Sequence, residues 1–294
     1  MEIVTRATRL RSLAARLAAE SKTIGLVPTM GALHDGQIHM VREAQRLTDA
    51  VIVAVFVNPL QFNTQAEYEA YPRDLARDAD MLSPLGVKYI YAPSTEEMFP
   101  PGFASWVEVK LRDQELESAA RPDHFRGAAT VLTIYYNLMQ PRFVFMGQKD
   151  AQQTIIAKKL ARDLHFPVEI IVTPTIREAD GLAMSSRNEF LSADERKAAT
   201  VMPRALQLAE TLFTDGERNA AKIMKAMRKE IEQEPLARLD YIAATDTEQL
   251  DPLEDMSGRA TLISLAIYFG KTRLVDNVIL HDEKFKPKVG IKLG

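Results

Sequence analysis

A short glycine-containing segment near the start of the chain has the residues to bind phosphate. Gly31 and Gly36 bracket a tight connection between a predicted strand at residues 24–27 and a helix expected to begin near Asp35. The first N–H groups of a helix lack partners within the helix, and the positive end of its dipole lies there, so anions bind readily. His34 stands at this entrance, where its imidazole could donate to a phosphate oxygen. The pattern predicts a phosphate site, although many such turns bind nothing.

A second glycine-containing turn follows a predicted strand at residues 142–145. Gly147 again precedes a predicted helix, Lys149 could neutralise a phosphate, and Asp150 could accept from a ribose hydroxyl. Gln153 lies in the first turn of the same helix. The ordinary alternative is a capped helix with polar surface residues.

Further polar segments carry amides, hydroxyls and a guanidinium. Asn58 and Gln61 follow the apolar run 51–57, and neutral amides can pair with hydroxyl and carboxylate groups. Residues 184–188 bring two serines and Arg187 together on a loop, and the fork of donors on arginine suits a polyphosphate. Residues 121–127 place a histidine among polar groups in a predicted loop. Each segment alone has a structural explanation, as a turn, a linker or a cap.

The first 175 residues alternate short strand-like runs with helical patterns, which predicts an α/β fold, a Rossmann-like doubly wound parallel sheet with helices on both faces. In such sheets ligands bind beyond the carboxyl ends of the strands, where most of these polar segments fall. The expected strands are residues 24–27, 51–57, 88–92, 142–145 and 168–172, and the helical spacings lie at residues 38–47, 75–82 and 155–164.

The pattern changes after Arg187 towards a smaller α+β domain. Ser192 and Glu195 form a capping box for a long helix predicted to run through Phe213. We expect a Rossmann-like domain at residues 1–177 and a smaller C-terminal α+β lid domain at residues 178–294. A second helix is expected near residues 219–232, strands at residues 240–244, 261–269 and 273–280, and a solvated basic tail at residues 284–288.

Composition bounds the possible functions. The chain has 294 residues, 46% of them hydrophobic and 26% charged, as in ordinary globular proteins. It has no cysteine, which excludes disulfides, thiolate metal sites and a cysteine nucleophile. The net charge of −3 does not favour nucleic acid as a partner. We expect no secretory signal and no membrane span, because the apolar runs are too short, and therefore a cytoplasmic location.

An ordered set of motifs closely resembles the pantothenate synthetase family, also called pantoate–β-alanine ligases, over about residues 23–277. The family belongs to a nucleotidyltransferase group built on a His-x-Gly-His turn. The motifs that carry the resemblance are residues 27–34, 56–62, 71–73, 124–127, 147–150, 185–188 and 273–277.

The resemblance implies a two-step ligation in pantothenate biosynthesis. The carboxylate of pantoate attacks the α-phosphate of ATP, giving pantoyl adenylate and pyrophosphate. The amine of β-alanine then attacks the acyl carbon, releasing pantothenate and AMP. Mg²⁺ accompanies the ATP, no protein-held metal is expected, and the resemblance implies a homodimer.

The resemblance also implies roles for individual residues. Catalytic roles fall to His34, Gln37, Lys149 and Arg187, and the loop at residues 184–188 would close over ATP. Pantoate would be bound by Asn58, Gln61 and Gln153, with Gln61 also near β-alanine. The residues implied in ATP binding are Met30, Gly31, Ala32, Leu33, His34, Asp35, Gly36, Gln37, Gly147, Gln148, Lys149, Asp150, Ile176, Met184, Ser185, Ser186 and Arg187.

The chain departs from the family at one catalytic position. The turn runs His34-Asp35-Gly36-Gln37, so glutamine replaces the second histidine, to which the family assigns a donor role towards the phosphates. Glutamine can still donate a hydrogen bond from its amide, but it carries no positive charge. Loss of one transition-state donor typically costs about 10²–10³ in rate, or ~3–4 kcal/mol.

Two alternatives to a working ligase follow from the sequence. Because of Gln37, the chain could be a catalytically impaired protein that binds ATP and pantoate. It could also be a sister adenylyltransferase that retains AMP in its product, although the motifs around Asn58 and Gln153 argue against this interpretation.

Overall fold

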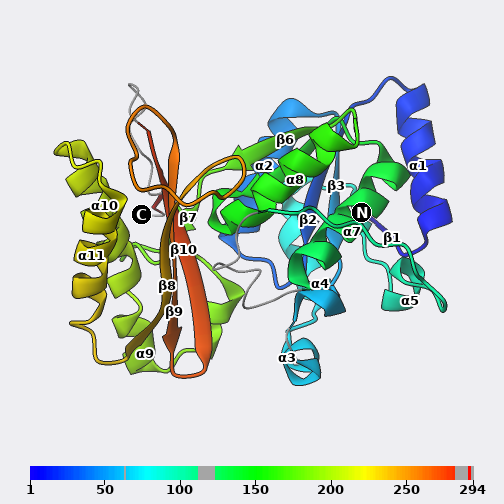
Figure 1. The fold of residues 1–294 in the computed structure, drawn as a ribbon. Helices are drawn as coiled ribbons and strands as arrows, with labels where there is room; N and C mark the ends of the chain where they lie inside the picture. The colour runs from blue at the N-terminus through cyan, green and yellow to red at the C-terminus, as the bar shows by residue number, and fades with distance from the viewer. Residues whose placement is uncertain (63, 112–122, 282–290, 293–294) are drawn as a thin grey trace. The chain divides into compact units, whose positions relative to one another are not determined.

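A computed structural model describes residues 1–62, 64–111, 123–281 and 291–292 (Figure 1). The basic tail at residues 284–288 and the start of the 121–127 segment lie outside the described residues. The chain forms two compact units. Of the described residues, unit 1 holds those within Met1–Lys110, Glu117–Gly147 and Gln152–Thr173, and unit 2 holds those within Leu111–Leu116, Gln148–Ala151 and Pro174–Gly294.

Unit 1 is built on a six-stranded sheet in the order β1-β4-β3-β2-β5-β6. Every neighbouring pair is parallel, which confirms the predicted sheet. The sequence prediction missed β1, which has only three residues and leaves the side chain of Ile3 exposed. The strands are β1 (Glu2–Val4), β2 (Ile24–Thr29), β3 (Ala50–Val55), β4 (Tyr89–Tyr91), β5 (Phe143–Gly147) and β6 (Glu169–Thr173).

Helices cover both faces of this sheet. Alternate strand residues point to opposite faces, and apolar residues on each face pack against helices. Leu26 and Ile52 pack in a core with residues of α1, α7 and α8, whereas Val27 and Val53 pack with α2 and α4. This double burial explains the continuous apolar run of β3. The helices are α1 (Ala7–Ala19), α2 (Asp35–Leu47), α3 (Gln65–Ala70), α4 (Leu75–Leu82), α5 (Thr95–Met98), α7 (His124–Met139) and α8 (Ala151–Asp163), and the 3₁₀ turns are η1 (Pro59–Gln61) and η2 (Ser83–Leu85).

The strand order reverses beside β2, since β3 and β4 follow on one side and β5 and β6 on the other. Such a reversal opens a crevice beyond the carboxyl ends of the strands, where ligands bind in open α/β sheets. The segment that begins at Met30 leaves β2 at this point, and the segment that begins at Asn58 follows its neighbour β3. The topology of unit 1 thus places both candidate segments at the edge where a ligand is expected.

A buried carboxylate fixes the turn between β2 and α2. Gly31 and Ala32 both have left-handed backbones, with φ angles of 79° and 49°. Asp78 of α4, whose side chain is buried, accepts hydrogen bonds from the N–H groups of Ala32 at 3.1 Å and Leu33 at 2.8 Å. Gly31 is required here, because a Cβ at this position would lie 2.9 Å from Asp78 Oδ2. The carboxylate holds a backbone conformation that a non-glycine residue rarely adopts.

Unit 2 has a three-stranded antiparallel sheet in the order β10-β9-β8, with α10 and α11 side by side on one face (Figure 1). The predicted long helix after Ser192 is wrong: it is two helices with a break at Ala199 and Thr200. Pro203 explains the break, because its ring would clash with the Ala199 carbonyl in a continuous helix, but fits the first turn of a new one. The elements are β7 (Ile176–Arg177), η4 (Ser186–Phe190), α9 (Ala193–Ala198), α10 (Val201–Thr214), α11 (Ala220–Ile231), β8 (Ala237–Asp246), β9 (Thr261–Phe269), β10 (Thr272–Leu280) and β11 (Ile291–Lys292).

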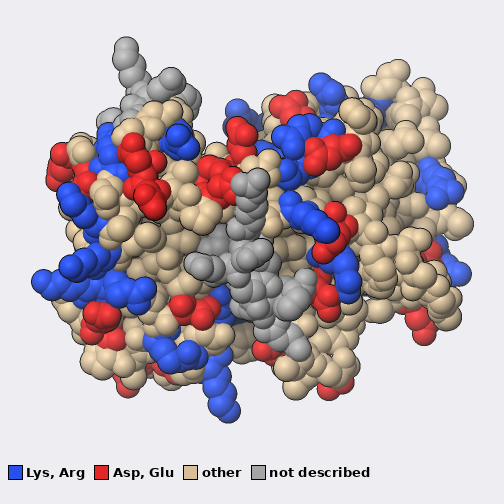
Figure 2. Space-filling model, in the orientation of Figure 1, with Lys and Arg blue, Asp and Glu red and all other residues tan. Residues whose placement is uncertain are grey.

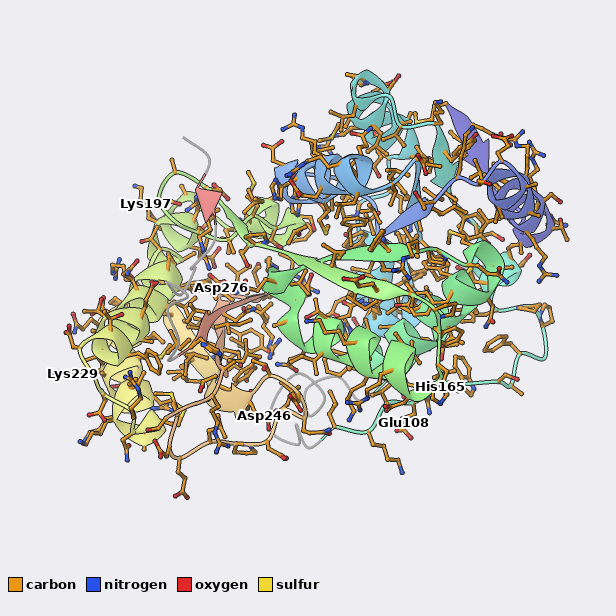
Figure 3. The ribbon with its side chains drawn as sticks, turned by 90° about the horizontal axis from the view of Figure 1, so that it is seen from above. Glu108, His165, Lys197, Lys229, Asp246 and Asp276 are labelled. Atoms are coloured by element: carbon orange, nitrogen blue, oxygen red, sulfur yellow. The ribbon has the colours of Figure 1, made fainter. Side chains whose placement is uncertain are left out.

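A buried ion pair ties β7 to β10 inside unit 2. Arg177 and Asp276 are almost fully buried and pair through two contacts, of 2.5 Å and 2.9 Å. Arg177 also donates to the carbonyl of Gly181 at 3.1 Å. Figure 3 shows Asp276 inside the unit, whereas Lys197 and Lys229 lie at its periphery. A buried pair is tolerated when its members are bonded in this way.

We expect replacement of Asp78 by Ala to lower the free energy of unfolding by about 2–4 kcal/mol, because two buried N–H groups lose a charged acceptor. Urea titration followed by circular dichroism measures the change. D80A is the matched control, since Asp80 is exposed on the same helix, and it should stay within ~0.5 kcal/mol of wild type. Equal stabilities of D78A and D80A would contradict a structural role for the Asp78 carboxylate.

Candidate active site

His34 and Gln37 cap the start of α2 reciprocally. His34 Nδ1 accepts from the N–H of Gly36 at 3.1 Å, and Gln37 Oε1 accepts from the N–H of His34 at 2.9 Å. Because Nδ1 accepts, the proton of the neutral imidazole lies on Nε2. Because the amide oxygen of Gln37 is occupied by the backbone, its remaining polar atom is the NH₂ donor. Both side chains are thereby oriented as hydrogen-bond donors at the positive end of the helix.

These bonds correct one sequence expectation. We expected unpaired N–H groups of the turn to form the phosphate site, but hydrogen bonds within the protein already engage most of them. The backbone of the turn therefore offers few free donors, whereas His34 and Gln37 retain side-chain N–H groups. The side chain of Leu33 packs in the core, and Asp35 is exposed as the first residue of α2. The N–H groups with partners inside the protein are those of Gly31, Ala32, Leu33, His34 and Gly36.

The amide pair after β3 is buried and preorganised. Asn58 Oδ1 accepts from the N–H of Leu60, and Asn58 Nδ2 donates to Gln61 Oε1, both at 3.2 Å. The bond to its oxygen leaves the Gln61 amide group as a donor towards a ligand. His124 Nδ1 lies 3.3 Å from the main-chain oxygen of Gln61.

The described part of the 121–127 segment is the start of a helix and not the loop expected from the sequence, because α7 begins at His124. Gly127 in its first turn has a packing role. A Cβ there would lie 2.6 Å from Leu60 Cβ and 3.2 Å from Asn58 Nδ2. Gly127 therefore lets α7 approach the turn that carries Gln61.

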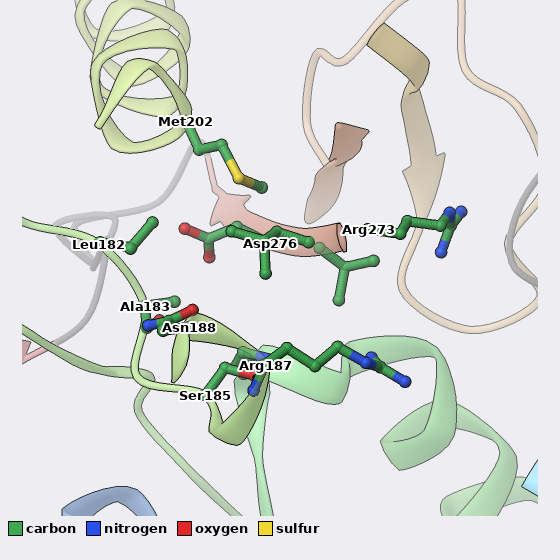
Figure 4. Close-up of a pocket in the computed structure, with 11 residues that line it drawn as sticks. Leu182, Ala183, Ser185, Arg187, Asn188, Met202, Arg273 and Asp276 are labelled. Carbon is green, nitrogen blue, oxygen red and sulfur yellow. The ribbon is translucent and has the colours of Figure 1, made fainter. Parts of the chain in front are cut away.

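Within unit 2, Lys149, Ser185 and Arg187 line one pocket (Figure 4). Figure 4 shows Met202 of α10 on one side, Ser185 and Arg187 on the other, and Asp276 between them. A lysine, a guanidinium and a hydroxyl around one pocket form a donor set for a polyphosphate. The lining residues are Lys149, Leu182, Ala183, Ser185, Arg187, Asn188, Met202, Arg273, Leu274, Val275 and Asp276.

The loop that carries Ser185 and Arg187 is fixed by side-chain bonds. Ser185 Oγ accepts from the N–H of Arg187 at 3.3 Å and caps η4. Asn188 Nδ2 donates to Glu178 Oε1 and to the Ala183 carbonyl, which closes the loop on itself.

Arg196 supports the start of this loop. Its guanidinium donates to Glu178 at 2.6 Å and to Asp180 at 2.7 Å. The hydrogen bond from Arg196 lowers the pKa of Asp180 below its usual value. The pair with Arg196 should therefore persist to a lower pH than an unpaired aspartate would allow.

The candidate residues fall into two sets. The structure brings together His34 with Gln37 and Asn58 with Gln61 in one set, and Ile176 with Met184 and Lys149 with Ser185 and Arg187 in the other. Gln153 lies half-buried on α8, and Ile176 is buried on β7. The unit 1 set is Met30, Gly31, Ala32, Leu33, His34, Asp35, Gly36, Gln37, Asn58, Gln61, Gly147 and Gln153. The unit 2 set is Gln148, Lys149, Asp150, Ile176, Met184, Ser185, Ser186 and Arg187.

Two buried residues that bond to the backbone of candidate site residues were not predicted from the sequence. Asp78 carried a signal, because it is a charged residue on the apolar face formed by Leu75, Ala79 and Leu82. Asn277, which bonds the backbone of Lys149, lay in a recognised motif but had no assigned role. Both act through contacts between residues far apart in the chain, which a local pattern does not reveal.

The surface carries charges of both signs, in line with the small net charge of the chain. Figure 2 shows acidic and basic side chains interspersed on the visible face. Across the described residues, no group of three or more His, Asp or Glu side chains could hold a metal ion. The helices within that part of the chain are too short or too polar to cross a membrane.

Comparisons with known proteins place the chain in a family. The model of the pantoate–β-alanine ligase family matches residues 2–279. A pantothenate synthetase from Moorella thermoacetica is 45% identical over 280 residues, which cover 95% of this chain and 99% of the relative.

Solved structures agree with this placement. Pantothenate synthetase from Thermus thermophilus matches with a TM-score of 0.86 and 41% identity, covering 94% of this chain and 98% of that chain. Pantoate–β-alanine ligase from Francisella tularensis, solved with β,γ ATP and β-alanine, matches with a TM-score of 0.77 and 33% identity, covering 94% and 97%. These matches confirm the resemblance inferred from the motifs. The chain belongs to the pantoate–β-alanine ligase family.

Proposed function

We propose that this chain condenses pantoate with β-alanine at the expense of ATP, through pantoyl adenylate. In the first step a carboxylate oxygen of pantoate bonds to the α-phosphorus, and the bond to the bridging oxygen of pyrophosphate breaks. In the second step the amine nitrogen of β-alanine bonds to the acyl carbon and loses a proton, and AMP leaves with the oxygen that joined it to the acyl group. Such displacements depend on positioning and charge stabilisation more than on covalent help from the protein.

The observation that supports this proposal most strongly is the donor orientation at the start of α2. The backbone occupies the acceptor atoms of His34 and Gln37, so both side chains present N–H groups. Charge develops on phosphate oxygens as pyrophosphate leaves, and preorganised donors stabilise it without reorganising. We therefore assign His34 and Gln37 to the phosphates during adenylation, with Met30, Gly31 and Ala32 lying against ATP.

In the proposed function, Lys149 and Arg187 of the unit 2 pocket are the positively charged side chains that bind the phosphates of ATP. Lys149 and Arg187, with Ser185 and Ser186, would bind the triphosphate and the departing pyrophosphate. Both cations are half-buried, which strengthens their attraction to phosphate relative to exposed groups. In the same proposal Asp150 takes the ribose, Gly147 allows backbone approach, Ile176 packs by the adenine, and residues 178–294 act as a lid.

Pantoate would be held by amides. Asn58 orients Gln61 so that its NH₂ group donates, which suits a carboxylate or hydroxyl oxygen. Gln153 would complete this clamp, and Gln61 would also lie near β-alanine. A neutral clamp is suited to the reaction, because a cation bonded to the reacting carboxylate would weaken it as a nucleophile.

Mg²⁺ would enter with ATP as its counter-ion. Magnesium is usually held by substrate phosphates with only one or two carboxylates, so the ion would be bound mainly by ATP. When bound, the ion would neutralise phosphate charge. The homodimer and the cytoplasmic location implied by the sequence stay predictions.

We expect the protein, incubated with pantoate, β-alanine and Mg-ATP, to form pantothenate, AMP and pyrophosphate in equal amounts, measured by chromatography. Omission of pantoate should abolish AMP formation, since the carboxylate is the nucleophile. No AMP above background would refute the ligase. AMP retained in a larger product would instead indicate the sister adenylyltransferase.

We expect Gln37→Glu to lower kcat by about 10²–10³, because it removes the amide donor. A carboxylate oxygen can still accept from the His34 N–H, so the capping box and the melting temperature should be retained. Steady-state kinetics and thermal unfolding separate the two effects. A kcat within about threefold of wild type would show that Gln37 contributes no transition-state donor.

Gln37→His tests the impaired alternative, because it restores the residue of the family pattern. We expect kcat to rise by less than about tenfold, since the amide already supplies one donor. A rise of about 10² or more, measured under the same conditions, would establish the chain as a catalytically impaired binder of ATP and pantoate.

A further inference from the structure

The segment that carries Lys149 is bound by one buried amide on β10. Asn277 is 3% exposed, and its Nδ2 donates to the main-chain oxygens of Gln148 at 3.0 Å and Lys149 at 2.9 Å. Its Oδ1 accepts from Gln148 Nε2 at 3.4 Å. Every polar atom of the Asn277 side chain is thus engaged with the 3₁₀ turn η3 (Gln148–Asp150). This turn therefore belongs with unit 2, although its neighbours along the chain on both sides belong to unit 1.

The backbone next to Asn277 is fixed in turn by a charged pair. Asp276 Oδ1 accepts from the N–H of Asn277 at 2.8 Å, and the same carboxylate pairs with Arg177. Arg177 holds the carbonyl of Gly181, in the turn that leads to Ser185. Two adjacent residues of β10 thus bind the two segments that line the pocket, Asp276 on the side of Ser185 and Asn277 on the side of Lys149.

A lysine side chain needs such support if it is to hold a phosphate precisely. Its four-carbon stem is flexible, so its ammonium group is placed only as well as its main chain is placed. A displacement of ~1 Å in a reacting geometry can cost about 10² in rate. The hydrogen bond from Asn277 Nδ2 to the main-chain oxygen of Lys149 supplies this support directly.

We propose that Asn277 is a positioning residue that acts through Lys149, fixing this cation against Ser185 and Arg187 as one phosphate-binding group carried by unit 2. The proposal rests on the proposed function, since it takes the pocket to bind the phosphates of ATP. Asn277 touches no substrate in this account.

A double-mutant cycle on N277A and K149A tests the coupling, with ATP affinity measured by calorimetry in the absence of pantoate. N277A alone should weaken ATP binding by about tenfold, as expected for one misplaced charged hydrogen-bonding group. In the K149A background the same change should alter affinity by less than about twofold, because the group through which it acts is gone. Equal effects in both backgrounds, or no effect in either, would overturn the proposal.

Two further variants separate positioning from loss of fold. S264A is the matched control: Ser264 lies opposite Asn277 on β9, and its buried hydroxyl has no hydrogen-bond partner among the described residues. It should bind ATP as wild type does. N277D retains the size and acceptor of Asn277 but loses its donor. Because it buries a carboxylate against two carbonyl oxygens, it should unfold at a lower temperature than S264A. Its KM for ATP, measured well below that temperature, should rise more than its kcat falls.

The outcomes also separate this proposal from the proposed function. Wild type that forms no AMP, but shows the expected coupling in ATP binding, would refute the ligase and leave the role of Asn277 intact. Wild type that forms AMP, with N277D indistinguishable from S264A in ATP affinity, would refute only the role of Asn277.

Discussion

The hydrogen bonds from the turn after β2 to the Asp78 carboxylate are the constraint on which the rest of unit 1 depends. The left-handed backbone at Gly31 and Ala32 points the N–H groups of Ala32 and Leu33 to one side of the turn, and successive N–H groups in such a turn attract an anion. In this chain the anion is Asp78. The turn is thereby complete before any ligand arrives, and the helix that carries His34 and Gln37 begins from a fixed point. In the proposed function, the phosphates are therefore recognised by these two side chains and not by the backbone of the turn.

In unit 2, two buried residues of β10 play a similar supporting role. Burying Arg177 and Asp276 costs desolvation, so the pair adds little net stability, but it defines how β7 and β10 meet. The adjacent Asn277 fixes the turn that carries Lys149. In both units, therefore, buried polar residues that touch no substrate in this account support the residues assigned to the phosphates.

Much of this architecture follows from the sequence. The continuous apolar run of β3 and the helical spacing of α2 indicated a doubly wound sheet, because burial on both faces leaves a clear periodic pattern. The break before α10 was missed, since Pro203 can either sit in a first turn or interrupt a helix. β1 was missed because three residues give no period.

The candidate site was only partly predictable. Glycines at strand ends, with His34 and Lys149 beside them, indicated candidate positions, because phosphate sites use these residue types at helix starts. The phosphate role of these residues stays a prediction. The engaged backbone of the turn was not foreseen, since its partner, Asp78, lies 45 residues from Leu33 along the chain. The capping role of His34 was equally hidden, because histidine is not a usual N-cap, although Gln37 at the third helical position was a signal for a capping box.

The rate of the proposed reaction depends most on Gln37, because its side chain can donate a hydrogen bond but cannot carry a positive charge. If the described donors stabilise attack of a carboxylate on the α-phosphate, one carboxylate oxygen must leave with AMP. The most direct measurement is turnover of pantoate labelled with ¹⁸O in its carboxylate, with mass spectrometry of the products. We expect one ¹⁸O in each AMP and one in the amide carbonyl of pantothenate. Unlabelled AMP, or ¹⁸O in released phosphate, would contradict an acyl-adenylate intermediate.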